Sequence, residues 1–265
     1  MKKILISIAL IIGLGFLLLY SFQEKILFLP YQLPSSYSFS FSGNYEEINF
    51  ETKDKNSINA LLFKADSSKG IIYYLHGNGG ALSGWGEFAE TYTNLGYDVL
   101  MIDYRGYGKS TGKIKSLEQL FEDNQFIYNI LKEHYGENKI TLLGYSLGSG
   151  LASKLASENQ PQLLILQAPY YSIEFVMNER LPFIPSFILK YNINTSEYLK
   201  KADMPVVIFH GLEDKTISYL NALKLQSEFK KSDTLISIEN LGHAGMTENI
   251  IYQENLKKVL DNFNL

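Results

Sequence analysis

The five residues Gly144-Tyr145-Ser146-Leu147-Gly148 follow directly after the apolar run Ile140-Thr141-Leu142-Leu143. They spell G-x-S-x-G at the end of a predicted buried strand, and the small-residue-rich segment 149–157 is predicted to be a helix. A sharp strand-to-helix turn lifts a serine hydroxyl clear of the backbone, and only small flanking residues fit there because the backbone approaches itself closely. Ser146 would face the helix N-terminus, where free N–H groups can bind a developing oxyanion. The stretch therefore predicts a nucleophilic serine between a strand and a helix.

Short apolar runs on both sides of this stretch predict further strands. An antiparallel pair is expected first, followed by strands that alternate with helical segments such as the capped helix 117–135 and an amphipathic helix from about residue 247. The predicted strands are residues 45–51, 57–64, 71–75, 98–103, 139–143, 163–167, 206–210 and 235–238. Buried strands separated by helices indicate an α/β fold, in which helices cover both faces of a mostly parallel central sheet.

Composition narrows the classes of function. The chain has 265 residues, which suits one large domain, and its net charge of −4 offers no basic field for a nucleic acid. It contains no cysteine, which excludes disulfides, thiolate metal sites and a cysteine nucleophile.

The N-terminus predicts a membrane anchor. After Lys2 and Lys3, residues 4–20 are apolar except for Ser7, and these 17 residues at about 1.5 Å each just cross a hydrocarbon core. A cleaved signal peptide is the rival interpretation, but the residues after the run lack a small-x-small cleavage signature. We expect a single-pass anchor over residues 1–22, with the two lysines inside and the rest of the chain on the non-cytoplasmic side. Secretion after cleavage is the alternative.

Beyond the anchor, we expect a connector over residues 23–43 and one domain over residues 44–265. The segment 170–201 does not fit the alternation of strands and helices, because it carries Pro182, Pro185 and many large apolar residues. It is predicted to be a lid inserted after a strand. Its apolar side chains are explained equally well by an acyl-binding pocket and by packing of the lid on the domain.

A nucleophilic serine needs a base, and the chain offers four histidines. His243 stands in a flexible loop after the last predicted strand and is the expected base. His210 ends a strand and is expected to pack or to bond to backbone, His134 is expected at the surface, and His76 opens a glycine-rich loop.

The expected acid is Asp214, which lies in the short loop after residues 206–210, with Glu213 as the nearest substitute. Helix capping is the structural alternative for Asp214. The order Ser146, Asp214, His243 along the chain is one of the orders in which such triads occur, each residue following a successive strand.

A second glycine-rich loop, His76-Gly77-Asn78-Gly79-Gly80, follows the strand 71–75. The backbone N–H groups of Asn78 and Leu147 are expected to form an oxyanion hole. A phosphate-binding loop is excluded because no Gly-Lys-Ser/Thr and no G-x-G-x-x-G follows. A third loop, residues 103–110, carries Asp103 and Arg105, which would either bind substrate or form a structural ion pair that shapes the loop.

Taken together, His76-Gly77-Asn78-Gly79, the loop 103–110, Gly144-Tyr145-Ser146-Leu147-Gly148, the loop 210–214 and Gly242-His243 resemble an α/β-hydrolase over nearly the whole chain. The resemblance is closest to the membrane-anchored α/β-hydrolase-domain serine hydrolases, which also begin with one span and an apolar stretch like residues 24–30. It implies the hydrolase fold and hydrolysis of lipid, thioester or carboxylic-ester substrates. Tyr145 and Gly150 occupy variable positions of the pattern.

The expected activity is therefore acyl transfer to water from esters or thioesters of apolar acyl groups. Ser146 attacks, His243 acts as base, Asp214 orients the imidazole, and neither a metal nor an organic cofactor is required. An aminopeptidase of the same fold is the nearest rival, and it would need an acid in the lid, for which Glu174 and Glu179 are candidates. A non-catalytic binding protein that kept the fold is the other alternative.

Overall fold

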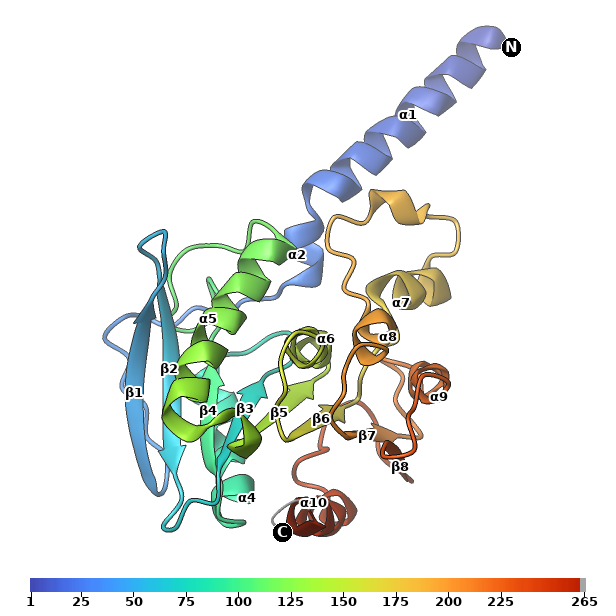
Figure 1. The fold of residues 1–265 in the computed structure, drawn as a ribbon. Coiled ribbons are helices and arrows are strands. Elements are labelled where there is room, and N and C mark those ends of the chain that lie inside the picture. The colour runs from blue at the N-terminus through green and yellow to red at the C-terminus, as the bar shows by residue number, and fades with distance from the viewer. Residues whose placement is uncertain (263–265) are drawn as a thin grey trace.

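The computed structural model describes residues 1–262, which form one eight-stranded sheet with helices on both faces (Figure 1). The strand order is β1-β2-β4-β3-β5-β6-β7-β8; β2 pairs antiparallel with both β1 and β4, and all other neighbours are parallel. The predicted mostly parallel sheet with an antiparallel start is confirmed. The strands are β1 (Asn44–Glu51), β2 (Ser57–Lys64), β3 (Ile71–Leu75), β4 (Asp98–Ile102), β5 (Ile140–Tyr145), β6 (Leu163–Gln167), β7 (Val206–Gly211) and β8 (Thr234–Ile238).

The helices include short ones that sequence periodicity did not indicate, such as α3, α4 and α9. The α-helices are α1 (Lys2–Ser21), α2 (Gln23–Leu27), α3 (Leu82–Trp85), α4 (Ala89–Thr93), α5 (Leu117–Tyr135), α6 (Leu147–Ala156), α7 (Ile173–Arg180), α8 (Thr195–Leu199), α9 (Leu220–Gln226) and α10 (Ile250–Asn262). The 3₁₀ turns within residues 1–262 are η1 (Gly86–Phe88), η2 (Glu137–Lys139) and η3 (Ser186–Ile188).

The sheet separates two apolar cores because alternate strand residues point to opposite faces. In β3, Tyr73 packs in the core beneath α5, α6, α8 and α9, whereas Tyr74 packs in the core beneath α3, α4 and α10 (Figure 1). Both faces of β3, β4, β5, β6 and β7 are therefore covered, and every residue of these strands is buried, whereas the edge strand β8 is partly exposed. The carboxyl ends of these strands remain free to carry loops.

The helix ends follow local hydrogen bonding. Helix α5 begins where the Ser116 side chain accepts from the N–H of Gln119 at 3.1 Å, and the Gln119 amide accepts from the N–H of Lys115 at 2.9 Å. Helix α10 begins at Ile250, three residues later than expected, because the Asn249 side chain accepts from the N–H groups of Ile251 and Tyr252 and so caps it.

Helix α1 projects away from the domain (Figure 1). Its mean hydropathy is 2.6, and by length and composition it can cross a membrane. It ends at Ser21, directly before α2, which lies against the domain. The chain from 170 to 201 holds α7, η3 and α8; its last part is core, since Tyr191, Ile193 and Leu199 are buried.

Candidate active site

Ser146 occupies the turn between β5 and α6 with a φ of +50°, a backbone conformation that a non-glycine residue adopts at a cost. Its N–H donates to the Gln167 carbonyl at 2.9 Å, which fixes the turn to β6. A Cβ at Gly148 would lie 1.9 Å from the Leu75 carbonyl oxygen, so β3 approaches too closely for any side chain there. These contacts give the physical reason for the small residues around Ser146, and α6 starts directly after it.

The structure brings Ser146, His243 and Asp214 together from three separate loops. His243 Nδ1 lies 2.7 Å from Asp214 Oδ2, and His243 Nε2 lies 3.0 Å from Ser146 Oγ. Since a carboxylate only accepts, Nδ1 carries the proton and Nε2 is left to accept the serine hydroxyl. This is the relay geometry that acyl transfer requires.

The surroundings of Asp214 keep it ionised. Burial would raise the pKa of this carboxyl, but hydrogen bonds from His210, His243 and the backbone N–H of Ile217 outweigh burial and hold the pKa well below its usual range. Its Oδ1 accepts from the N–H groups of Thr216 and Ile217, each at 2.8 Å. Asp214 therefore caps the following turn through Oδ1 and contacts the His243 imidazole through Oδ2. The capping role considered as an alternative and the contact with His243 are both present.

Asn78 and Leu147 line the same pocket as Ser146 and His243. Within residues 1–262, the backbone N–H of neither residue donates to another protein group, so both donors are free to meet an oxyanion. Two side chains hold the loop that carries Asn78 in place by hydrogen bonds to its backbone. Trp85 Nε1 donates to the Gly79 carbonyl at 3.0 Å, and the Tyr104 hydroxyl donates to the His76 carbonyl at 2.8 Å.

The side chain of Asn78 has a further role that the sequence did not indicate. Its Nδ2 donates to the Leu27 carbonyl at 2.7 Å, and its Oδ1 accepts from the Leu29 N–H and from the Tyr107 hydroxyl, both at 2.9 Å. These hydrogen bonds hold the segment directly after α2 beside the glycine-rich loop 76–80. Residues 51 positions apart in sequence meet here, and no local pattern signals that pairing.

The cavity beside Ser146 has a volume of about 300 Å³ and is mostly apolar. Its walls come from the connector, the lid and the loop after β7, including Phe28, Tyr170, Val176, Tyr191 and Ile217. Arg180, at the end of α7, also lines it, and among the described residues around the cavity there is no carboxylate side chain. The lid therefore contributes both apolar walls and one cation.

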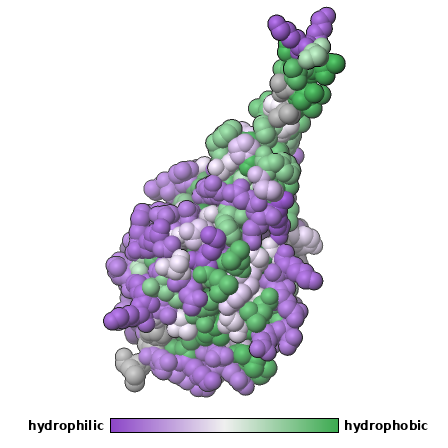
Figure 2. All heavy atoms as spheres, turned by 90° about the vertical axis from the view of Figure 1, so that its right-hand side faces the viewer, coloured by the Kyte–Doolittle hydropathy of each residue, from purple (hydrophilic) through white to green (hydrophobic). Residues whose placement is uncertain are grey.

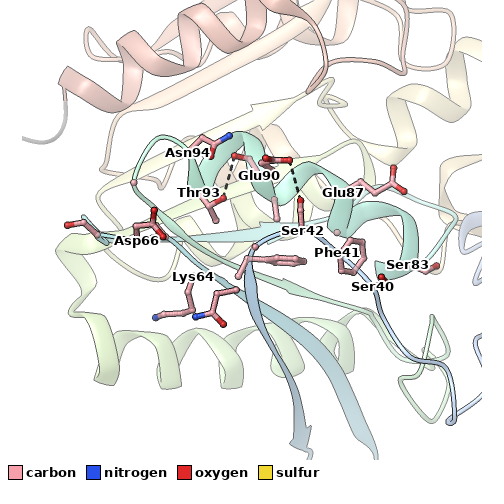
Figure 3. A pocket seen from close by; sticks show the side chains of 18 of the residues that line it. Ser40, Phe41, Ser42, Lys64, Asp66, Ser83, Glu87, Glu90, Thr93 and Asn94 are labelled. Atoms are coloured by element: carbon pink, nitrogen blue, oxygen red, sulfur yellow. Dashed lines mark hydrogen bonds between the residues drawn. The ribbon is translucent and has the colours of Figure 1, made fainter.

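A larger depression, about 860 Å³, lies around α4 and contains none of these residues. Figure 3 shows that its side chains are largely polar, with Ser42 donating to Glu90 at 3.4 Å. It therefore contains neither Ser146 nor apolar walls that could bind an acyl chain.

The other histidines lie as expected. His210 is buried and bonds to the Ile217 carbonyl at 2.9 Å, and His134 is exposed. Tyr145, whose position appeared uninformative, donates its hydroxyl to the His243 carbonyl and so supports the loop that carries His243. Among residues 1–262, no group of three or more His, Asp or Glu side chains is placed to hold a metal ion.

Arg105 forms a structural ion pair, although its partners are not in its own loop. The guanidinium is 4% exposed and donates to Asp123 at 2.5 and 2.8 Å and to Asp54 at 2.7 and 2.9 Å. These contacts raise the pKa of Arg105 and hold the pKa of Asp54 well below its usual range. Asp103 instead accepts from the Leu82 N–H at 3.0 Å, and burial raises its pKa.

Replacing Arg105 with methionine should destabilise the fold by about 3 to 5 kcal/mol, because Asp123 would keep a buried charge without a partner. Urea unfolding measures this loss. Lys55→Met is the control, since the exposed pair of Lys55 with Glu51 contributes little to stability. If Arg105→Met is as mild as Lys55→Met, the assigned structural role is wrong.

This chain is similar to several known proteins. The profile of a family described as "Serine aminopeptidase, S33" matches residues 66–192. Protein bem46 of Schizosaccharomyces pombe is 30% identical over 225 residues, which cover 78% of this chain and 74% of that protein. The esterase Pf2001 of Pyrococcus furiosus shares the fold, with a TM-score of 0.68, 18% identity, and coverage of 89% of this chain and 96% of the esterase chain.

The lysophosphatidylserine lipase ABHD12 of Macaca fascicularis is 30% identical over 182 residues, which cover 61% of this chain. The match spans 46% of that lipase, so the chain corresponds to less than half the length of this relative. Together with the sheet order and the turn at Ser146, the match to bem46 over most of both chains shows that this protein belongs to the α/β-hydrolase superfamily, as one of its serine hydrolases.

Proposed function

We propose that this protein hydrolyses esters or thioesters of a single apolar acyl chain through a covalent acyl-enzyme. Ser146 Oγ attacks the carbonyl carbon and gives its proton to His243 Nε2, while Asp214 holds the imidazole and faces the positive charge that develops on it. The carbonyl oxygen receives hydrogen bonds from the N–H groups of Asn78 and Leu147. His243 then protonates the leaving group and, in the second half-reaction, activates the water that releases the acid.

The observation that supports this proposal most is the pair of distances at His243, 3.0 Å to Ser146 Oγ and 2.7 Å to Asp214 Oδ2. A histidine with a purely structural role does not need to contact both a serine with positive φ and a buried carboxylate. The free N–H groups of Asn78 and Leu147 beside the same serine supply the second element of acyl-transfer catalysis.

The substrate class follows from the cavity. A volume of about 300 Å³ lies at the lower end of ligand-binding pockets and suits one acyl chain rather than several. Arg180 at its wall favours an ester that also carries a negative charge. The lysophosphatidylserine lipases among the relatives are named for such a substrate, and we extend that class, a single-chain acidic lipid ester, to this chain.

An aminopeptidase is the competing function, because the matching profile bears that description. Binding a free amine requires an acid near the serine. Glu179 instead accepts from the Ser218 hydroxyl at 2.6 Å and from Asn221 at 3.0 Å, and Glu174 lies 3.5 Å from the Asn192 amide. Neither lines the cavity, whereas Arg180, which would repel an amine, does. These placements favour the esterase.

We further propose that α1 anchors the protein in a membrane, with residues 1–22 as the anchor, residues 23–43 as the connector and the hydrolase domain on the non-cytoplasmic side. The apolar composition of α1 and the lysines before it support this arrangement. Mass spectrometry of the mature N-terminus distinguishes an uncut anchor from a cleaved signal peptide, which would begin the chain after the apolar run.

A substrate panel tests the proposed activity. We expect purified full-length protein to hydrolyse nitrophenyl acyl esters and acyl thioesters much faster than amino-acyl amides. Faster cleavage of the amides would support the aminopeptidase instead. A well-folded sample that turns over none of the three classes would support a non-catalytic binding protein.

Replacing Arg180 with glutamine should raise KM about two- to fivefold for a single-chain ester that carries a phosphate, because an ion pair at an exposed site is lost. An uncharged glycerol ester of the same acyl chain should be unaffected. Lys201→Gln is the matched control, since Lys201 is exposed and lies outside the cavity. An equal change on both esters would contradict a role for Arg180 in charge recognition.

A further inference from the structure

The first residues of α2, which directly follow α1, are held to the lid by hydrogen bonds. We call this junction, residues 21–25, the foot of α1. Gln23 is 6% exposed; its Nε2 donates to the Ile188 carbonyl at 2.5 Å and its Oε1 accepts from the Lys190 N–H at 2.8 Å. The next residue, Glu24, pairs with Lys190 and accepts from the Tyr191 hydroxyl at 2.9 Å. Figure 1 shows η3 beside the lower part of α1. The direction of α1 and the position of the lid are therefore set together.

Three large apolar side chains of the lid face outward next to this junction. Leu181 is 41% exposed, Phe183 is 74% exposed and Phe187 is 83% exposed. Figure 2 shows the apolar surface of α1 continuing onto the part of the domain directly below it. Phenylalanines exposed to this degree have no packing role within the described chain, and they lie where a membrane surface would meet the domain if α1 spans the bilayer.

A groove of about 550 Å³ lies at the same junction; its lining is mostly apolar but includes several lysines. Lys25, Lys113 and Lys115 line it; all three are exposed, and within residues 1–262 none of them forms an ion pair. The groove also contains Glu24 and Lys190, which neutralise each other, and Arg105, whose charge is satisfied by Asp54 and Asp123. Three uncompensated cations therefore gather at this place in a chain whose net charge is −4.

We propose that the face around the foot of α1 is a docking surface for an anionic lipid bilayer, with Phe183 and Phe187 among the acyl chains and Lys25, Lys113 and Lys115 at the headgroups. Aromatic side chains at a helix exit partition to the membrane interface. Basic side chains there are attracted to the headgroups of any leaflet that contains anionic lipid. The inference rests on the proposed anchoring by α1, because the anchor confines this face to the membrane and so selects a bilayer over a soluble partner.

Docking would place the wall of the active-site cavity that Phe28 and Tyr191 form next to the lipid surface. Phe28 follows α2 directly, is 4% exposed, and packs edge-to-face on Tyr191 with ring centroids 5.1 Å apart. Both rings line the cavity that contains Ser146. A single-chain ester would then reach Ser146 laterally from the bilayer, along the wall that the connector and the lid share.

The absence of cysteine makes a site-specific test direct. Single-cysteine variants Phe183→Cys and Phe187→Cys of the full-length protein are labelled with an environment-sensitive fluorophore and reconstituted in vesicles of phosphatidylcholine and phosphatidylglycerol. Leu10→Cys in α1 reports anchoring, and Phe126→Cys, 39% exposed on α5, reports the aqueous side of the domain.

We expect the labels at 183 and 187 to shift to the blue and to be quenched by lipid-borne quenchers, like the label at 10 and unlike the label at 126. Aqueous labels at 183 and 187 together with an apolar label at 10 would overturn docking and leave anchoring and hydrolysis intact. A blue shift that grows with the protein-to-lipid ratio would indicate a second copy of the chain on this face and would also overturn it.

Kinetics provide an independent test. The double variants Phe183→Ser/Phe187→Ser and Lys113→Gln/Lys115→Gln should each lower hydrolysis of a single-chain ester embedded in these vesicles by about tenfold. Hydrolysis of soluble nitrophenyl acetate should be unchanged, because none of the four residues lines the catalytic cavity. An unchanged rate on vesicles, or an equal loss on both substrates, would contradict the proposal.

Discussion

Replacing Ser146 with alanine should lower kcat for nitrophenyl esters by about four to six orders of magnitude, because the attacking oxygen is lost and the remaining groups act only as a unit. The effect should appear in kcat rather than in KM, since the cavity walls that bind the acyl chain are unchanged. Steady-state kinetics on the full-length enzyme, with wild-type protein at matched concentration, measure it.

The control is Ser157→Ala, which removes a serine hydroxyl just after the other end of α6. That hydroxyl donates to the Lys154 carbonyl at 2.7 Å and does not meet the cavity. It should retain full activity, and both variants should unfold at the wild-type temperature. If Ser146→Ala keeps activity within tenfold of wild type, the proposed nucleophile is wrong.

Replacing Asp214 with asparagine should lower kcat by about 10⁴, the loss seen when an amide replaces the carboxylate of such a triad. An amide at this position would let Nδ1 of His243 become the acceptor, and the proton would then move to Nε2, where it prevents acceptance from Ser146. The geometry of the loop should persist, because the asparagine oxygen can still cap the turn at Thr216 and Ile217.

Glu213→Gln is the matched control for this substitution. Glu213 is adjacent and exposed, whereas Asp214 is buried and contacts His243. At each pH from 5 to 8, the kcat of Glu213→Gln should equal that of the wild-type protein. If Glu213→Gln lowers kcat about 10⁴-fold and Asp214→Asn leaves it unchanged, Glu213 and not Asp214 is the acid of the triad.

The lowered pKa of Asp214 also fixes the sign of its contribution to stability. A carboxyl whose folded pKa lies below its unfolded value, about 3.9, stabilises the fold above that pH, and this contribution is lost as pH falls through the folded pKa. Asp214 therefore stays ionised throughout the neutral range. Loss of activity on mild acidification is not expected to come from protonation of this carboxyl.

The sequence was most informative where local chemistry alone determines structure. The bounds of β2, β3 and β6 agree with prediction because each is an apolar run between turn-forming residues. Helix α5 was predictable because Ser116 caps its start and Gly136 ends it. The glycines around Ser146 were predictable because the turn leaves no room for a Cβ at Gly148.

The remaining features depend on contacts between distant segments, which periodicity does not encode. Arg105 reaches Asp54 and Asp123 rather than a loop neighbour, and Tyr145 bonds to the backbone of His243. At Gly150 a Cβ would lie 2.1 Å from the hydroxyl of Tyr170, a residue of the cavity wall, so this glycine admits the ring. The short helices α3 and α9 span too few turns to show a period.

The connector is the feature with the largest functional consequence among those that the sequence did not reveal. Sequence predicted a link between anchor and domain, whereas the structure uses Leu27, Phe28 and Leu29 as a wall of the cavity beside Ser146. Asn78 holds this wall through its side-chain amide, and its backbone N–H is the proposed donor to the oxyanion. The proposed membrane anchor and the proposed acyl-binding cavity thus share one stretch of chain.

The convergence of Ser146, His243 and Asp214 into one reactive group is tested most directly by a fluorophosphonate, which phosphonylates only a serine that has been made nucleophilic. Peptide mass spectrometry of the treated full-length protein should show a single adduct on the peptide that contains Ser146, and this adduct should be absent from Ser146→Ala and strongly slowed in His243→Ala. A folded protein that acquires no adduct, or acquires it on another residue, would contradict the account.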